Sequence, residues 1–241
     1  MKNTFGFILL LIAFSSYSQH GDQTYKVTLL RAKPGNLLEL IDVIKSDITN
    51  YQDYQTDKPY LLRHSQGDHW DLMVINPIEN IDQYFSTALS EKRGNAKTIE
   101  KSYGDRFFDL VSFQEEAIVK GPDKATFNTA MSDHNLFHIE IFTALAGKQA
   151  ELLKQREDEN VFYSKFDHRP NFIFTRVFGP SWDIFTIGWY KDLHDYAGPD
   201  TPFEVEDKAA KDAGFEGVRY IGSYLRSLLL EHHDTLAGKV E

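Results

Sequence analysis

The chain has 241 residues, a formal net charge of −10 at pH 7 and no cysteine. The lack of cysteine excludes disulfides, thiolate chemistry and lipid attachment at a cysteine. The acidic balance, without a cluster of Lys and Arg, argues against nucleic acid as a partner because a phosphate backbone would be repelled on average. An exported chain of this composition has to be stabilised by its apolar core alone.

The N-terminus reads MKNTFGFILLLIAFSSYSQH. Lys2 gives a positive start, residues 5–14 form an apolar run, and Ser16, Tyr17 and Ser18 form a small-residue cleavage pattern, which together are typical of a secretory signal peptide. The run is about ten residues long, against the ~20 that a helix needs to cross a bilayer, so we expect no permanent membrane anchor. We expect cleavage after Ser18 and a periplasmic or secreted protein.

Two stretches of the chain are similar: WDLMVINPIENIDQY at 70–84 and WDIFTIGWYKDLHDY at 182–196. A shift of 112 positions aligns 25–84 with 137–196 without a gap, and a second shift of 117 aligns the end of each copy. Matches of this kind predict an internal duplication. The predicted organisation is a signal peptide (1–18), a first repeat (19–122), a linker (123–134) and a second repeat (135–241).

Both copies have the same order of predicted elements. Period-two alternation predicts a first strand, a Gly-containing turn follows, and apolar residues at helical spacing predict a helix. Two strands around a Gly turn then predict a hairpin, which a second helix and a last strand follow. The predicted strands are 25–31, 60–65, 70–75 and 113–119 in the first copy, and 137–143, 172–178, 182–187 and 230–236 in the second.

This order is that of the ferredoxin-like unit (βαββαβ), an antiparallel sheet with helices on one face. The other face has to be covered, and the second copy is the obvious cover. We therefore predict an α+β fold of two tandem ferredoxin-like repeats whose antiparallel sheets face each other. The length, the spacing and the Trp-Asp hairpins resemble the dimeric α/β-barrel superfamily, which includes antibiotic-biosynthesis-monooxygenase-type and NIPSNAP-type proteins.

In that superfamily two such units close their sheets around a central cavity. The resemblance implies a pseudo-dimeric α/β barrel that binds a small molecule, and haem is a cofactor of some families in the group. None of the families' catalytic motifs can be placed on this sequence. Trp70 and Trp182, each at the entrance of a predicted strand and followed by Asp, have two candidate roles, namely structural support of the strand or stacking on a ligand.

His138 and Glu140 lie two residues apart on the first strand of the second copy and therefore share one face. We expect Ile139 and Ile141 to pack on the helices, which turns His138 and Glu140 toward the barrel interior. First and last strands are neighbours in a ferredoxin-like sheet, and the last strand carries Glu-His-His-Asp at 231–234. One of its faces, Glu231 with His233 or His232 with Asp234, should lie beside His138 and Glu140.

Imidazole and carboxylate groups of this kind fit three roles: a Zn²⁺, Fe²⁺ or Cu²⁺ site, general acid–base catalysis, or hydrogen bonding with no chemistry. The candidate catalytic residues are His138, Glu140, His232 and His233, and the candidate metal ligands are His138, Glu140, Glu231 and His233. In the first copy Lys26 and Thr28 replace His138 and Glu140, and the 117-residue shift places Gln114, Glu115 and Glu116 at 231–233. The copies differ more in these polar residues than in the scaffold, so we expect a single asymmetric site.

Arg176 lies between Phe174 and Phe178 at period two, where it can clamp an anionic group or form an ion pair with an acidic residue. The candidate substrate-binding residues are Arg176, His64, Arg63, Trp70 and Trp182. The sequence has no dinucleotide fingerprint, P-loop, HExxH, GxSxG or EF-hand motif and requires no particular cofactor, although a divalent metal or haem stays open. We expect an exported small-molecule-binding barrel, either an oxygenase- or isomerase-like enzyme or a non-catalytic binding or assembly protein, that dimerises if exposed sheet edges pair.

Overall fold

The computed structural model describes residues 21–49, 57–89, 91, 102–166 and 168–240; the predicted signal peptide lies outside the described residues. The first half contains β1 (Gln23–Ala32), α1 (Leu37–Thr49), β2 (Tyr60–Gln66), β3 (Leu72–Ile78), α2 (Ile81–Tyr84), α4 (Ser102–Leu110) and β4 (Val111–Gly121). The segment between the repeats forms α5 (Lys124–Asp133). The second half contains β5 (Leu136–Ala144), α6 (Gln149–Tyr163), β6 (Phe172–Phe178), β7 (Ile184–Tyr190), α7 (Leu193–Ala197), α8 (Phe203–Asp212), α9 (Val218–Ser227) and β8 (Leu229–Lys239).

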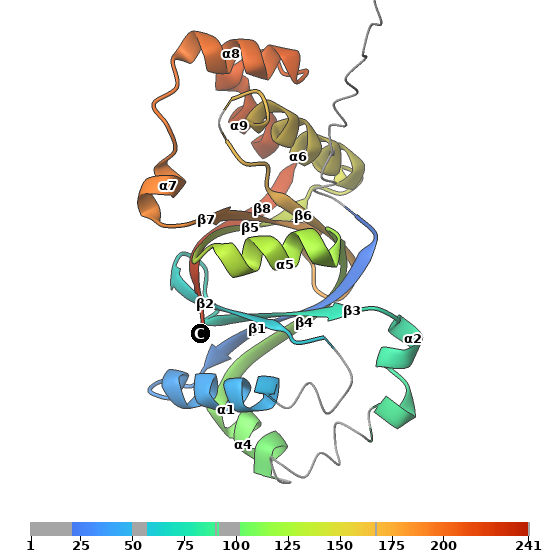
Figure 1. Cartoon of the computed structure of the whole chain (residues 1–241). Helices are drawn as coiled ribbons and strands as arrows, with labels where there is room; N and C mark the ends of the chain where they lie inside the picture. The colour runs from blue at the N-terminus through green and yellow to red at the C-terminus, as the bar shows by residue number, and fades with distance from the viewer. Residues whose placement is uncertain (1–20, 50–56, 90, 92–101, 167, 241) are drawn as a thin grey trace, which may run out of the picture.

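The strands form a closed antiparallel barrel in the order β1-β3-β2-β8-β5-β7-β6-β4. Each half contributes four neighbouring strands in the ferredoxin-like order, and the pairs β2–β8 and β4–β6 join the halves. Figure 1 shows the two sheets facing each other, with α1 and α4 outside the first sheet and α6, α8 and α9 outside the second. The predicted α+β fold of two tandem ferredoxin-like repeats is confirmed.

The barrel interior is filled with apolar side chains that all eight strands contribute. At one end α5 packs Phe127, Ala130 and Met131 against this core. Trp70 and Trp182, which are 0% and 6% exposed, belong to the same core and lie at the opposite end, because Trp70 precedes the Leu72–Leu30 pair at the far end of β1 from Tyr25. The expected central cavity is therefore wrong for the described residues: large aromatic and aliphatic side chains occupy this space.

Matched residues have the same structural role in the two halves. Asp71 and Asp183 accept hydrogen bonds from the backbone N–H of Ala32 and Ala144, at 2.8 and 2.9 Å, and so tie each hairpin to the end of the half's first strand. The two tryptophans do not start strands as predicted, because β3 and β7 begin two residues later, at Leu72 and Ile184. The identities that reveal the duplication thus belong to the scaffold.

The strand pairing corrects the second of the two predicted shifts. Thr28 pairs with Glu116 on β4, whereas the equivalent Glu140 pairs with Asp234 on β8. The last strands therefore correspond at a shift of 118 residues and not 117. A shift of one residue in a strand exchanges its two faces, so the corrected shift matches Gln114 and Glu116 with His232 and Asp234 in place of Glu231 and His233.

Helix α5, which closes one end of the barrel, begins after Asp123, whose Oδ1 accepts a hydrogen bond from the backbone N–H of Thr126 at 2.9 Å. The contact with Thr126 holds the pKa of Asp123 below its ordinary value. We expect Asp123→Ala to lower the free energy of unfolding by about 1 kcal/mol at neutral pH. Because the folded-state pKa is lowered, this stabilisation is present above the ordinary pKa of Asp and is lost as pH falls through the folded-state value. Urea unfolding of both proteins should show the difference shrinking in acid, and equal stabilities at neutral pH would contradict the capping role.

Candidate functional site

His138 and Glu140 lie on the outer face of β5, where they point toward α6. Their neighbours Ile139 and Ile141 lie in the barrel core, so the prediction that the isoleucines pack on the helices and the polar pair faces the interior is wrong. Both faces of β5 carry apolar side chains, because Phe142 on the outer face packs with the helices. Period two separates two such faces but does not say which of them faces the barrel.

The pairing of β5 with β8 decides which residues of 231–234 join them. Asp234 lies opposite Glu140 and His232 lies opposite Phe142, so His232 and Asp234 share the outer face. Glu231 and His233 fall on the other face, where His233 Nδ1 lies 3.5 Å from Asp68 Oδ1. The predicted metal set is therefore wrong in these two members, and His233 is separated from the other candidate catalytic residues.

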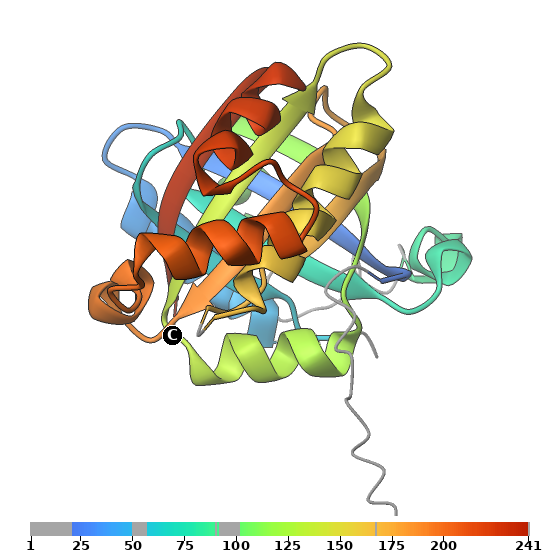
Figure 2. The same cartoon turned by 90° about the horizontal axis from the view of Figure 1, so that it is seen from above.

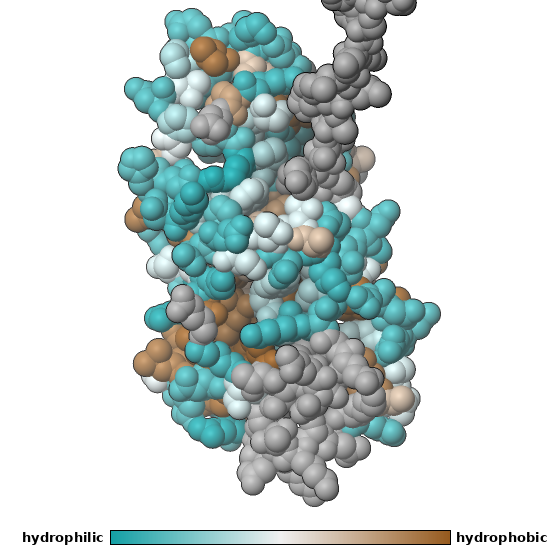
Figure 3. All heavy atoms as spheres, in the orientation of Figure 1, coloured by the Kyte–Doolittle hydropathy of each residue, from teal (hydrophilic) through white to brown (hydrophobic). Residues whose placement is uncertain are grey.

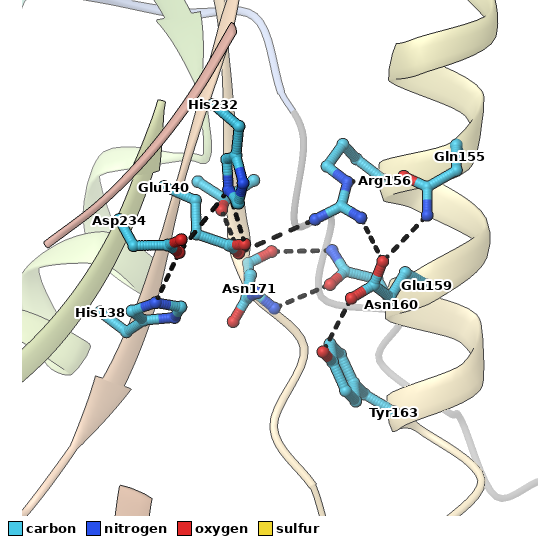
Figure 4. Close-up of polar contacts among 11 residues, drawn as sticks. His138, Glu140, Gln155, Arg156, Glu159, Asn160, Tyr163, Asn171, His232 and Asp234 are labelled. Atoms are coloured by element: carbon cyan, nitrogen blue, oxygen red, sulfur yellow. Dashed lines mark hydrogen bonds and ion pairs between the residues drawn. The ribbon is translucent and has the colours of Figure 1, made fainter. Parts of the chain in front are cut away.

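Four side chains, which we call the outer-face cluster, converge on β5 and β8: His138, Glu140, His232 and Asp234 (Figure 4). Nε2 of His138 lies 3.2 Å from Oδ1 of Asp234. Nε2 of His232 lies 3.4 Å from Oε1 of Glu140 and 3.6 Å from Oδ1 of Asp234. The side chain of Glu140 is 13% exposed and that of Asp234 is 57% exposed, so the cluster runs from a buried carboxylate out to solvent.

Helix α6 covers the buried side of the outer-face cluster with an arginine. Nη1 of Arg156 lies 3.7 Å from Oε2 of Glu140, which also accepts a hydrogen bond from the hydroxyl of Thr186 at 3.2 Å. The guanidinium group pairs with Glu159, donates to Oε1 of Gln155 at 2.7 Å and lies over the ring of Phe142. Arg156 is only 3% exposed, so this ionic network is buried between helix and sheet.

Two more side chains of α6 complete this network (Figure 4). Asn160 donates to the carbonyl oxygen of Asn171 at 2.7 Å and accepts from its backbone N–H at 2.8 Å. The hydroxyl of Tyr163 donates to Oε1 of Glu159 at 2.8 Å. None of these α6 residues was predicted as part of a site.

A comparison of the sequences of α6 and α1 provides a signal for these residues. At the shift of 112, Gln155, Arg156 and Asn160 replace the buried residues Val43, Ile44 and Ile48. In the first half the interface between helix and sheet is thus apolar at the three positions where the second half is polar. Polar groups buried where a related interface is apolar are expected at functional sites, because they cost stability.

The first half retains a simpler version of the outer-face cluster. Lys26 Nζ lies 2.6 Å from Glu116 Oε1, and Gln114 donates to the same oxygen at 2.9 Å. These residues occupy the positions of His138, Asp234 and His232, with Thr28 in place of Glu140. The second half therefore carries two imidazoles and a largely buried carboxylate that the first half lacks at these positions.

The electrostatics of the outer-face cluster favour charged forms. Burial opposes protonation of His138, but the hydrogen bond with Asp234 and the charge of Glu140 outweigh it and raise the pKa of the imidazole. Burial likewise opposes ionisation of Glu140, but the contact with His232 and the charge of Arg156 outweigh it and lower its pKa. The hydrogen bond with His138 lowers the pKa of Asp234 against a smaller opposing effect of burial. Glu140 and Asp234 are thus anionic at neutral pH.

The other candidate residues lie at other places in the fold. Arg176 donates to Oδ1 of Asp183 at 2.9 Å, which is the ion pair that the sequence offered as its alternative role. Trp182 donates from Nε1 to Oε1 of Glu115 at 2.8 Å, whereas Nε1 of Trp70 is buried and makes no hydrogen bond within the described part of the chain. His64 contacts the ring of Trp70 at a centroid distance of 5.7 Å, and Arg63 is exposed.

Helix α7 borders the outer-face cluster on its open side. The ring of Tyr196 lies 5.4 Å from that of His138 and 5.1 Å from that of Tyr190. Tyr190 in turn lines a surface cavity of about 290 Å³, together with His168, Arg169, His194, Asp195, Gly198 and Pro199. Burial, aided by Tyr196 and Glu140, raises the pKa of Tyr190 to about 12, so its hydroxyl stays protonated at neutral pH. A small ligand in this cavity would contact Tyr190, with Tyr196 and then His138 beyond it.

Solved structures with a similar fold are known. An anthrone oxidase-like protein is 12% identical with a TM-score of 0.60, and the match covers 92% of this chain and 93% of that one. A putative monooxygenase from Fusobacterium nucleatum is 9% identical with a TM-score of 0.55, covering 92% and 94%. A chlorite dismutase from Candidatus Nitrospira defluvii is 10% identical with a TM-score of 0.50, covering 92% of both chains.

These similarities show that the chain has the fold of the dimeric α/β-barrel superfamily, in agreement with the predicted resemblance. No family model matches the sequence, and no curated protein matches it. At such low identity the neighbours define the architecture, and the chemistry has to be argued from the residues. Within the part of the chain that the structure describes, no helix is both long and apolar enough to span a membrane.

Haem, which the superfamily resemblance left open, does not fit the outer-face cluster. The space between β5 and α6 is filled by Arg156, Gln155 and Glu159 packed against Phe142 and Glu140. Helix α6 carries no histidine that could serve as an axial ligand above the sheet. A porphyrin needs a wide apolar slot, whereas this interface is narrow and ionic.

Proposed function

We propose that the protein is a small-molecule enzyme whose active centre is the outer-face cluster of the second half, where a proton is transferred to or from the bound molecule. The observation that carries this proposal is the replacement of an apolar interface, Val43, Ile44 and Ile48, by buried polar residues at the same positions of α6. Helix α1 packs on the first sheet with apolar residues at these positions, so the fold does not require polar residues there. An activity that needs charged groups beside β5 explains why α6 carries polar residues at these positions.

The arrangement suits proton transfer for geometric reasons. Nε2 of His138 lies 3.2 Å from Oδ1 of Asp234, within the ~2.6–3.2 Å over which a proton passes between heavy atoms, and Nε2 of His232 lies 3.4 and 3.6 Å from the two carboxylates, so a small shift would bring it into this range. Glu140 is held by Arg156 and Thr186, while the more exposed Asp234 and His138 face the open side. Isomerases and oxygenases that act on carbon acids begin by removing a proton, so this reaction class is part of the proposal.

The substrate in this proposal is small and enters from the side of α7. The cavity beside Tyr190 has about 290 Å³, at the lower end of the ~300–1,000 Å³ typical of ligand pockets. Its lining of imidazole, guanidinium and phenol groups suits a polar or aromatic molecule. In the view of Figure 3 the surface of the upper, second half is mainly hydrophilic. Export through the segment 1–18 is also part of the proposal, and the mass of the protein recovered outside the cytoplasm would test cleavage after Ser18.

Proton transfer can be measured before the substrate is known. We expect the protein to exchange solvent deuterium into at least one member of a set of small ketones, keto acids and phenols in D₂O, followed by ¹H NMR. Asp234→Asn should slow this exchange by on the order of 100-fold or more, the range typical of a group that takes part in proton transfer. The matched control is Glu116→Gln, which removes the equivalent carboxylate of the first half and should leave the exchange unchanged.

Two outcomes would count against the proposal. Equal loss of exchange in Asp234→Asn and Glu116→Gln would mean that the effect is structural and common to both halves. A ligand that binds with no exchange of any proton, in the wild type, would instead support the alternative of a non-catalytic binding protein.

A further inference from the structure

We infer that the outer-face cluster is a binding site for one divalent transition-metal ion, with Zn²⁺ or a chemically similar ion as its occupant. His138, Glu140 and Asp234 each place one ligand atom within 4.8 Å of the others. His232 adds a fourth donor beside Glu140 and Asp234. The inference rests on the proposed function only for the role of the ion, because metal binding itself can be measured without substrate.

The spacing of the donor atoms fits tetrahedral coordination. With bonds of about 2.0–2.1 Å from zinc to nitrogen and oxygen, the edge of a regular tetrahedron is about 3.3–3.4 Å. Three donor pairs of the cluster lie at 3.2, 3.4 and 3.6 Å: His138–Asp234, His232–Glu140 and His232–Asp234. Three of the six donor pairs are thus already near ligand–ligand distances, and side-chain rotations would have to bring the remaining pairs together around an ion.

The charge of the site favours a cation of two positive charges. The carboxylates of Glu140, Asp234 and Glu159 face a single guanidinium, that of Arg156, so two negative charges are left when both imidazoles are neutral. The imidazoles of His138 and His232 offset this negative charge only if at least one of them is protonated. A divalent ion bound at Nε2 of His138 and His232 would displace those protons and neutralise the site.

The groups around the donors have the character of an outer coordination shell. Oε2 of Glu140 accepts from Thr186 and lies beside Arg156, which fixes the carboxylate and leaves Oε1 directed at His232. The ring of His232 stacks on Phe142 with an interplanar angle of 6°, and this contact holds the imidazole plane. Such support from a second layer of residues is what orients ligands in metal sites.

Four protein donors fill a tetrahedral shell, so a bound ion would act as a Lewis acid in the proposed reaction only when a fifth ligand is added or one of the four is released. The first half cannot form the same site. Its equivalent positions hold Lys26, Thr28, Gln114 and Glu116, which offer one carboxylate, and the ammonium of Lys26 already lies 2.6 Å from that carboxylate. The protein therefore contains its own control for adventitious binding.

The test is a titration of the chelator-treated, tag-free protein with Co²⁺, followed by calorimetry and by the visible absorption of tetrahedral Co²⁺. We expect one ion per chain, competed by Zn²⁺. Asp234→Asn and Glu140→Gln keep the size of each side chain and should weaken binding by on the order of 100-fold. Glu116→Gln should bind as the wild type does, and circular dichroism of each variant confirms that it folds.

No saturable Co²⁺ binding, or equal affinity in the wild type and in Asp234→Asn, would overturn the inference. The deuterium-exchange assay separates this failure from that of the proposed function. Exchange that persists in a protein unable to bind Co²⁺ would refute the metal site alone, whereas stoichiometric binding without any exchange would support the metal site and refute the proposed reaction.

Discussion

Arg156→Ile should lower the free energy of unfolding by about 3–5 kcal/mol, the cost of breaking a buried ion pair by removing one partner. The substitution installs the residue that α1 carries at the equivalent position, Ile44, so the new side chain suits a helix packed on this sheet. The loss arises because Glu140 and Glu159, whose side chains are each 13% exposed, remain without their cation. Urea unfolding followed by circular dichroism measures the effect.

A second substitution tests the cause. Adding Glu140→Thr, the residue of the first half at this position, removes one of the two stranded carboxylates and should recover part of the lost stability. Lys208→Ala, which removes one partner of the exposed Lys208–Asp212 pair, is the control and should cause no measurable change. If Arg156→Ile were as stable as the wild type, the buried ionic network would not exist as described.

Gly67→Ala is the second substitution with a large expected effect. Gly67 has φ of +125° in the turn between β2 and β3, and a Cβ added there would lie 2.0 Å from the carbonyl oxygen of Asp234 and 2.8 Å from Cα of Thr235. Both contacts are with the backbone of β8, which cannot move aside without disturbing the β2–β8 pairing that joins the two halves. We expect a loss on the order of 4 kcal/mol in the free energy of unfolding, the size of effect that strain and overpacking reach together.

The control for this substitution is Gly35→Ala. Gly35 also has a positive φ, +86°, but an added Cβ would meet nothing within 4 Å. Its loss should be only about 1–2 kcal/mol, the cost of the left-handed conformation. Equal effects of the two substitutions would show that the β2–β3 turn does not press on β8. Because Asp234 lies at this contact, Gly67→Ala should also weaken the outer-face cluster in the fraction that folds.

The fold could be predicted from the sequence because the same pattern of strands, turns and helices occurs twice in the chain. Gly67 and Gly179, Trp70 and Trp182, and Asp71 and Asp183 recur at one shift, and each pair proves to serve the same turn, core or strand end. Period two then located the strands, and the neighbourhood of first and last strands brought 231–234 to His138 and Glu140 correctly. The strand order within each half follows from these local facts, whereas the pairs β2–β8 and β4–β6 that close the barrel do not.

The site could be predicted only in part, for two physical reasons. Ile139 and Phe142 lie on opposite faces of β5, both packed in apolar clusters, so the alternation did not reveal which face lines the barrel. The sequence also left both faces of 231–234 open, and the predicted metal set took Glu231 and His233 although His232 and Asp234 lie on the outer face. Arg156 and its partners on α6 went unnoticed because a charged helix face is ordinarily solvated, and only comparison with α1 shows that this one is buried.

We place the functional site on the outer face of the second half, and neither in the barrel interior nor in the first half. The measurement that tests it most directly is a thermal-shift screen of small carboxylates, phenols and carbonyl compounds against the wild type, Asp234→Asn and Glu116→Gln. We expect some compounds to stabilise the wild type and Glu116→Gln by the same amount and to have no such effect on Asp234→Asn. Compounds that stabilise all three proteins equally would place the ligand elsewhere and contradict the claim.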